Sequence, residues 1–168
     1  QLRISQAAVT SRRATDVRRV GDLAYVTYDR EGLEILDIAD PASPRRLGFL
    51  ALPELDLLGL NVVDGSAHVA AGEAGLLVID VSDATIPQLL GRVDTPGRAQ
   101  AVVVQGGWAL VADGAAGLTV VDLTLPARPM VAATLSLPGE SVDVALSGSR
   151  AFVAMGYDGL HVVDVADP

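Results

Sequence analysis

The feature that most limits how this chain can fold is a fourfold repeat with a period of about 42 residues. Each repeat has a Gly-Leu pair followed by an apolar stretch that ends in Asp. The pairs begin at Gly32, Gly75, Gly117 and Gly159, with intervals of 43, 42 and 42 residues. The intervals are the same for Ala24, Ala67, Ala109 and Ala151. Such regularity predicts four copies of one supersecondary unit, each stacked on its neighbours.

Each repeat is interpreted as four short β-strands. Residues 100–113 contain two apolar runs joined by Gly106-Gly107, which is typical of a two-residue hairpin turn. The Gly-Leu stretch that follows is almost continuously apolar, as expected of a strand buried on both faces. A last run, such as residues 88–95, lies between prolines. Four strands per repeat of this length predict the blade of a β-propeller.

The two ends of the chain do not match this frame. The fourth repeat stops at Pro168 before a fourth strand, whereas an extra apolar segment, residues 1–9, precedes the first repeat. We therefore predict an all-β, four-bladed propeller whose N-terminal strand completes the fourth blade. That strand closes either its own ring or the ring of a neighbouring subunit, and the sequence leaves both open.

In this frame residues 1–168 form one propeller domain. Residues 1–15 are the closing strand and its tether, 16–58 blade 1, 59–100 blade 2, 101–142 blade 3 and 143–168 three strands of blade 4. The apolar contacts of the closing strand are expected to be Leu2, Ile4, Ala7 and Val9.

The repeated Gly-Leu-x-Val-Ile-Asp-Val-Ser-Asp stretch resembles the LVIVD repeat. Its copies span residues 32–40, 75–83, 117–125 and 159–167, and the third has Leu125 where the others end in Asp. The resemblance covers residues 16–168. It implies a β-propeller of the kind found in bacterial and archaeal surface or secreted proteins, and it brings no catalytic residue with it.

Composition narrows the classes of partner. The net charge of −9 argues against nucleic acid, because phosphate binding needs a basic face. No apolar run approaches the ~20 residues of a membrane-spanning helix. Residues 1–50 carry eight Arg against seven acids (+1), and the remainder carries four against fourteen (−10). Neighbouring copies could thus attract each other through Arg3, Arg12 and Arg13, although an ordinary solvated surface would look the same.

Two columns of carboxylates are candidates for a cation site. One column holds Asp37, Asp80, Asp122 and Asp164. We expect each to accept hydrogen bonds from its own turn, in preference to forming a cation site. The other column places Asp16 and Asp143 near the propeller axis beside Gly59 and Ala101, an incomplete ligand set for a hard cation. We expect no catalytic set, no metal site and no cofactor.

The sequence therefore favours a non-enzymatic interaction module, secreted or at the cell surface, whose partner is itself. Strand complementation would assemble it head to tail, as a fibre or surface-layer subunit. One alternative is a ligand- or metal-binding, or hydrolytic, propeller that uses the channel around Asp16 and Asp143. Another is that the chain is a section of a larger propeller protein.

Overall fold

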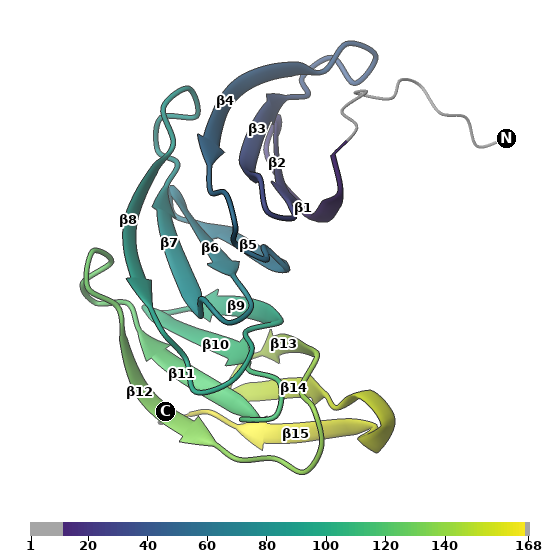
Figure 1. The fold of residues 1–168 in the computed structure, drawn as a ribbon, viewed down its shortest axis with the longest axis vertical. Helices are drawn as coiled ribbons and strands as arrows, with labels where there is room; N and C mark the ends of the chain where they lie inside the picture. Colours follow the sequence, from purple (N-terminus) through teal and green to yellow (C-terminus); the bar gives the residue numbers. More distant parts are fainter. Residues whose placement is uncertain (1–11, 167–168) are drawn as a thin grey trace, which may run out of the picture.

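The computed structural model of the protein describes residues 12–166, which form four antiparallel sheets (Figure 1). Blade 1 contains β1 (Ala14–Val20), β2 (Leu23–Tyr28), β3 (Gly32–Asp37) and β4 (Arg45–Ala51). Blade 2 contains β5 (Gly59–Val63), β6 (Ser66–Ala70), β7 (Leu76–Asp80) and β8 (Gln88–Val93). Blade 3 contains β9 (Ala101–Gln105), β10 (Trp108–Ala112), β11 (Leu118–Asp122) and β12 (Met130–Leu135). Blade 4 contains β13 (Asp143–Ser147), β14 (Arg150–Ala154) and β15 (Leu160–Asp164), with a 3₁₀ turn, η1, at Gly156–Asp158.

The turns follow from the glycines that punctuate each repeat. In blade 3, Gly106 and Gly107 have φ angles of 60° and 84°, and the strands they join pair from Gln105 opposite Trp108. Positive φ at both central residues is the requirement of a type I′ hairpin, which confirms the predicted turn. Within residues 12–166 no helix is long and apolar enough to cross a membrane.

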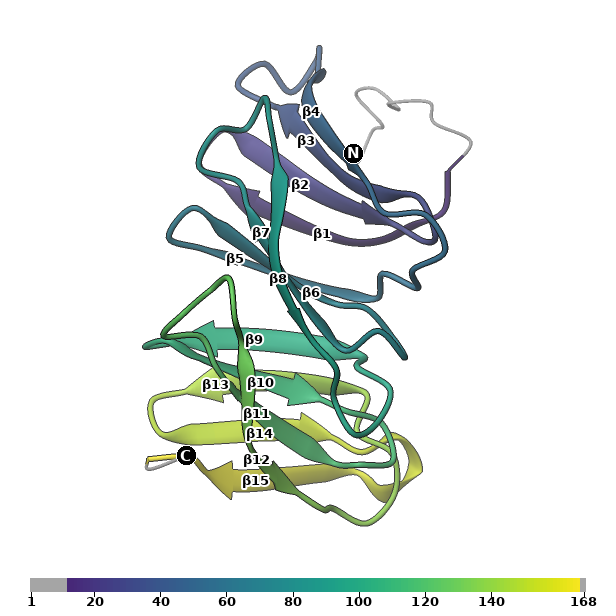
Figure 2. The ribbon, with the colours of Figure 1, turned by 60° about the vertical axis from the view of Figure 1, so that its left-hand side comes forward.

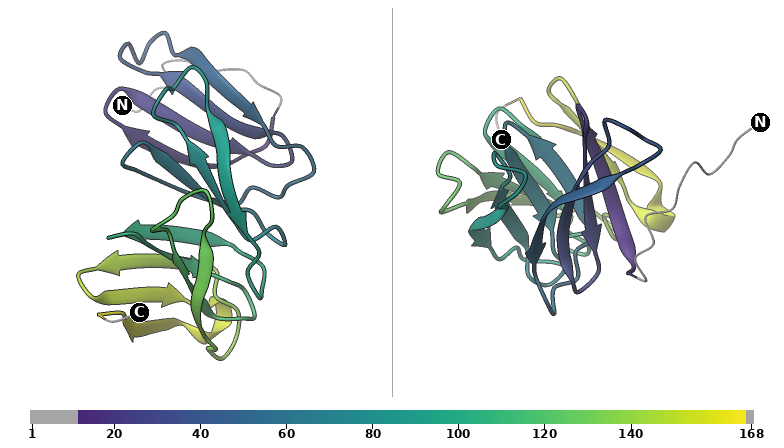
Figure 3. Two further views of the ribbon diagram at one scale, coloured as in Figure 1. Left: turned by 90° about the vertical axis from the view of Figure 1, so that its left-hand side faces the viewer. Right: turned by 90° about the horizontal axis from the view of Figure 1, so that it is seen from above.

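The blades follow an arc with their first strands on its inner side (Figures 1 and 2). Strand β1 contacts β5, β5 contacts β9, and β9 contacts β13. Blade 1 and blade 4 lie at opposite ends of the arc, as the side view in Figure 3 also shows. The fold is thus the predicted all-β arrangement of propeller blades, and within residues 12–166 the sheets do not close into a ring.

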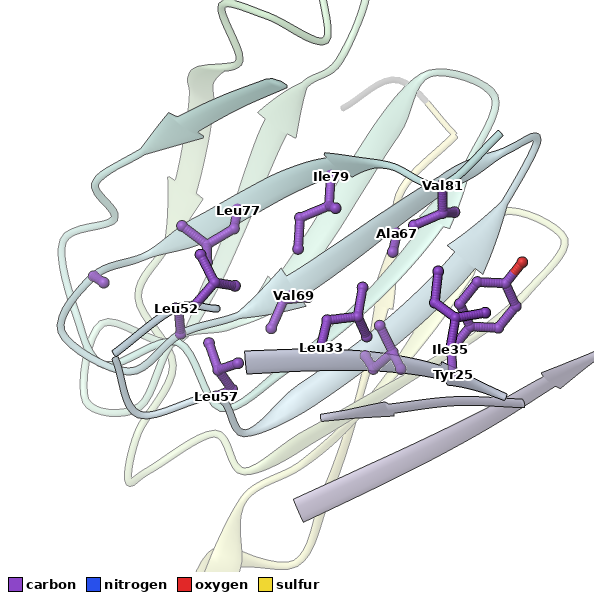
Figure 4. Packing of buried hydrophobic residues seen from close by; sticks show 13 residues of the cluster. Tyr25, Leu33, Ile35, Leu52, Leu57, Ala67, Val69, Leu77, Ile79 and Val81 are labelled. Atoms are coloured by element: carbon purple, nitrogen blue, oxygen red, sulfur yellow. The ribbon is translucent and has the colours of Figure 1, made fainter. Parts of the chain in front are cut away.

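Side chains packed between neighbouring blades form the core. Between blades 1 and 2, Leu33 and Ile35 of β3 meet Val69, Leu77 and Ile79 of blade 2 (Figure 4). Similar clusters join blade 2 to blade 3 and blade 3 to blade 4. Each blade therefore has a forward face, turned toward the blade that follows it in the chain, and a backward face, turned toward the blade before it.

The start of blade 1 differs slightly from the prediction. Strand β1 begins at Ala14, inside the expected tether, because pairing with β2 continues across an irregularity between Ala14 and Asp16. Thr15 bridges this irregularity through its hydroxyl, which donates to the Thr27 carbonyl at 3.1 Å. The predicted closing strand, including Leu2, Arg3, Ile4, Ala7 and Val9, lies outside the described residues.

Candidate interaction surfaces at the ends of the arc

The forward face of blade 4 exposes a leucine that the other blades bury. In the first three blades the leucine of the Gly-Leu pair is covered by the next blade. Leu33 and Leu76 are 0% exposed and Leu118 is 1% exposed, whereas Leu160 is 61% exposed. The repeat thus places a core residue in solvent at the end of the arc.

A second column behaves in the same way. Val162 is 55% exposed, although its counterparts, Ile35, Val78 and Val120, are buried. Val162 and Leu160 alternate along β15 and so point to one face of the sheet. Together they make the forward face of blade 4 an apolar surface with no cover among residues 12–166.

The backward face of blade 1 is the matching surface at the other end of the arc. Val17 of β1 is 57% exposed, whereas its counterparts, Leu60, Val102 and Val144, are buried against the preceding blade. Arg19 projects from the same face, because Val17 and Arg19 alternate along β1. Its only ion-pair partner among the described residues is Asp22, at 3.9 Å.

The outer part of this backward face is polar. Glu34 is buried, accepts a hydrogen bond of 2.7 Å from the Tyr28 hydroxyl and forms an ion pair with Arg46. The Arg12 guanidinium lies 4.7 Å from the centroid of the Phe49 ring, within cation–π range. In blade 2 the residue at the Glu34 position is Leu77. The end face of blade 1 is therefore not a plain copy of the internal interfaces.

A groove runs beside β15. Its volume is about 270 Å³, and its lining comes from β11, β12 and β15 with the residue after it: Leu118, Val120, Ala133, Thr134, Leu135, Val163, Asp164 and Val165. Strand β15 pairs with β14 on one side and has no second partner strand among residues 12–166. In each of the other three blades the third strand pairs with a fourth strand at the corresponding edge.

The inner side of the arc holds a polar pocket of about 280 Å³ that Asp16 and Asp143 both line. Oδ1 of Asp16 accepts from the Val17 N–H, and Oδ2 accepts from the Leu60 N–H. The part of the chain that the structure describes contains no group of three His, Cys, Asp or Glu side chains placed to hold a metal ion. Ligand binding or hydrolysis at this pocket stays a prediction.

The four repeated aspartates have turn geometry. Each accepts a hydrogen bond at Oδ1 from the backbone N–H two residues later: Ala39, Ser82, Thr124 and Ala166. The Ser82 hydroxyl and N–H hold the pKa of Asp80 below its usual value, and Thr124 does the same for Asp122. For Asp37 the Ala39 N–H is the main cause of a lowered pKa, followed by Arg45.

The predicted interface arginines that the structure describes pair within blade 1. Arg12 Nε lies 2.8 Å from a Glu31 oxygen, and Arg13 Nη1 lies 2.8 Å from an Asp29 oxygen. Sequence reasoning did not single out Val17, Leu160 and Val162, because in a repeat their columns indicate buried core. The signal that identifies them is their position in the first and last copies.

Comparison with solved structures shows the fold. The computationally designed Ika4 protein superimposes with a TM-score of 0.78 at 10% identity, over 96% of both chains. The designed Ika8 protein gives 0.74 at 10% identity, over 90% of this chain and 46% of that one. BamB from Moraxella catarrhalis gives 0.70 at 11% identity, over 92% and 45%. The chain thus spans less than half the length of the last two.

No curated protein sequence matches the chain. The LVIVD repeat family matches four segments, residues 11–48, 59–95, 96–135 and 138–168. Each segment overlaps one blade, and together they cover most of the sequence. The protein therefore belongs to the LVIVD-repeat family.

Proposed function

We propose that this protein is a non-enzymatic interaction module that assembles head to tail with copies of itself at the cell surface or outside the cell. The repeat propeller fold supports a role in protein interaction in general. The family resemblance supports the proposed surface or secreted setting. Self-association is the more specific part of the proposal, and the end faces of the arc carry it.

The observation that supports self-association most strongly is the exposure of Leu160. Covering a leucine or valine side chain fully contributes roughly 1.5–3 kcal/mol. Leu160 and Val162 are 61% and 55% exposed. Their burial by a partner would therefore make a substantial contribution to association.

The partner with the matching surface is a second copy of the chain. At each of the three interfaces between blades, the forward face of one blade packs on the backward face of the next. The repeat places the same residue columns on the two end faces that stay uncovered within residues 12–166. Blade 4 of one copy can then meet blade 1 of another through Leu160, Val162 and Val17. Such a heterologous contact generates a ring when the rotation closes and a fibre when it does not.

Charge supports the same pairing. Arg19 is exposed on the backward face of blade 1, and Asp164 is exposed at the end of β15. Residues 1–50 are nearly neutral with eight Arg, whereas the remainder carries a charge of −10. Exposed charges attract more strongly at low ionic strength, so added salt should weaken or slow the association.

Leu160→Asp tests the proposal, with Leu125→Asp as the matched control. Leu125 is 65% exposed, so both substitutions place the same charge on an exposed leucine. Mass would be measured by light scattering over a range of concentrations, and thermal melting would check folding. We expect Leu160→Asp to stay at the 17.3 kDa of one chain while Leu125→Asp associates like the unmodified protein. Equal association of the two variants would contradict the proposal.

A further inference from the structure

We infer that two copies join through a backbone bridge in which Gly156 of one copy exchanges hydrogen bonds with Ala14 of the next, beside an ion pair between Glu140 and Arg13. This inference rests on the proposed self-association and adds to it the atoms that align one copy on the other. Two junctions between blades within the chain provide the template.

The junctions between blades 2 and 3 and between blades 3 and 4 share a two-way backbone bridge. The Gly72 N–H donates to the Ala99 carbonyl at 3.1 Å, and the Ala99 N–H donates back to the Gly72 carbonyl at 3.1 Å. Gly114 and Ser141 exchange the same two bonds, at 3.2 and 3.0 Å. In both cases the glycine lies in the loop between the second and third strands of one blade, and its partner lies in the linker that leads into the next blade. The bridge therefore aligns each of these blades on the blade before it.

Gly156 is the residue of blade 4 that corresponds to Gly72 and Gly114. Each of the three precedes the glycine of its Gly-Leu pair by three residues, and the φ angle of Gly156, 53°, is close to the 57° of the other two. Gly72 and Gly114 are buried, whereas Gly156 is exposed. Within residues 12–166 no backbone acceptor receives the Gly156 N–H. The loop of blade 4 thus has the bridging glycine and lacks a partner for it in the described part of the chain.

Ala14 is the matching residue at the other end of the arc. It lies in the same column of the repeat as Ala99 and Ser141, which are both 0% exposed, whereas Ala14 is exposed. The Asp29 N–H donates to the Arg13 carbonyl at 2.9 Å, so Ala14 belongs to a non-hydrogen-bonded pair of the β1–β2 ladder. The N–H and C=O groups of Ala14 therefore point away from β2, to the side on which a preceding blade would pack.

The residues just before this column have alternating charges. In chain order they are Arg13, Asp56, Arg98 and Glu140. Between blades 2 and 3 the acid and the arginine meet, with Arg98 Nη2 3.2 Å from an Asp56 oxygen. Glu140 is exposed and has no ion-pair partner in residues 12–166. At a junction between copies the residue that follows Glu140 in this series is Arg13, so an acid again precedes an arginine.

The junction between blades 1 and 2 is built differently. There the Arg30 N–H donates to the Leu55 carbonyl, and blade 1 has Asp29 where the other three blades have the bridging glycine. A junction between copies uses the loop of blade 4, which contains Gly156. It therefore follows the pattern of the two bridged junctions.

A second copy is the partner that supplies both halves of the bridge. Blade 4 and blade 1 of one chain stand at opposite ends of the arc (Figure 1). When two copies meet, the backbone groups of Gly156 and Ala14 become covered, and covering them without hydrogen bonds would cost free energy. The bridge satisfies these groups, and the charges of Glu140 and Arg13 favour the same alignment.

Amide hydrogen exchange, measured for each residue by NMR, tests the bridge. Unmodified protein is compared at a dilution where it is one chain and at a concentration where light scattering shows association. We expect the N–H groups of Gly156 and Ala14 to exchange fast in the dilute sample and to slow on association toward the rate of Gly72, whose N–H is bonded within each chain. Gly106, in the exposed hairpin of blade 3, is the control and should stay fast.

The other outcomes separate the bridge from the proposed function. Association that leaves Gly156 and Ala14 in fast exchange would overturn the bridge and leave self-association standing. Slow exchange of both residues in the dilute, single chain would show that the chain closes on itself, and it would overturn the bridge between copies. A protein that stays at 17.3 kDa at every concentration would overturn both proposals.

Charge reversal tests the flanking ion pair. Glu140→Arg places like charges at the junction and should weaken association about threefold to tenfold. Adding Arg13→Glu to this variant should recover most of the loss. Glu73→Arg makes the same change of net charge on an exposed loop of blade 2 and is the matched control. An equal loss in the control, or a double variant no tighter than Glu140→Arg, would overturn the ion pair.

Discussion

His68 is the buried histidine of β6, in the column that holds Tyr25, Leu110 and Phe152 in the other blades. Its Nδ1 is buried without a hydrogen-bond partner in the described structure. Burial lowers the pKa of His68 from 6.5 to about 4, and a hydrogen bond with the Asn61 backbone opposes this shift. The imidazole is therefore packed as a neutral, largely apolar group.

This burial predicts a loss of stability in acid. Because the folded pKa lies below the unfolded value, the unfolded chain takes up the proton first, so stability falls as the pH drops below about 6.5 and levels off near 4. The loss is at most ~1.4 kcal/mol per pH unit and about 3 kcal/mol in all. His68→Leu introduces the residue that blade 3 has at the same place, Leu110. This substitution should remove this part of the pH dependence. Urea unfolding at pH 7 and pH 4.5 would measure it.

The aspartate turns provide the internal reference for that experiment. Asp37, Asp80 and Asp122 have lowered pKa values, so their contribution is present above the unfolded pKa and is lost as the pH falls through the folded one. His68→Leu leaves this acid limb in place. An unchanged slope between pH 6.5 and 4.5 in the variant would mean that His68 is not buried as a neutral group.

At the scale of the elements, β11 and β15 are the third strands of two similar repeats, but the two strands have different surroundings. Leu118 of β11 is 1% exposed, and Leu160 of β15 is 61% exposed. In dilute, unassociated protein we expect Leu118→Ala to lower the free energy of unfolding by about 2–5 kcal/mol. Leu160→Ala should change it by less than about 1 kcal/mol under the same conditions.

Denaturant titration at two protein concentrations would check this pair. At the higher concentration, where copies associate, the cost of Leu160→Ala should grow, because binding stabilises the folded form by mass action. The cost of Leu118→Ala should change much less. Equal costs in dilute protein would show that a single chain already covers Leu160.

The blades were predictable from sequence because their signals are local and repeated. Gly106-Gly107 fixes a hairpin by its backbone freedom, and the Gly-Leu stretch marks the buried third strand in every copy. The column of Asp16 and Asp143 was expected near the propeller axis, and the first strands that carry it, β1, β5, β9 and β13, do contact one another in order. Periodicity therefore determines the element, the turn and the order of strands.

The end faces were less predictable, because periodicity treats every copy as equivalent. Leu160 has the same local sequence context as Leu118, but within residues 12–166 a further blade packs on β11 and none packs on β15. The Glu34 cluster on blade 1 was missed for a related reason. Its partners, Tyr28 and Arg46, come together only when β2, β3 and β4 pair in register.

At the scale of the whole molecule, the arc formed by residues 12–166 has two uncovered end faces with related residue columns. The chain spans less than half of the Ika8 and BamB chains that it resembles in fold. Two copies joined at both ends would cover Leu160, Val162 and Val17 on each and leave no free face. An open series of copies would cover all but one face at each end.

The most direct test of this account is the mass of the unmodified protein in solution, measured by light scattering from low to high concentration. The account predicts that the mass rises above the 17.3 kDa of one chain and settles at two or more copies. Added salt should shift the rise to higher concentration. A mass of one chain at every concentration would contradict self-association. The exposed faces of blades 1 and 4 would then require another explanation.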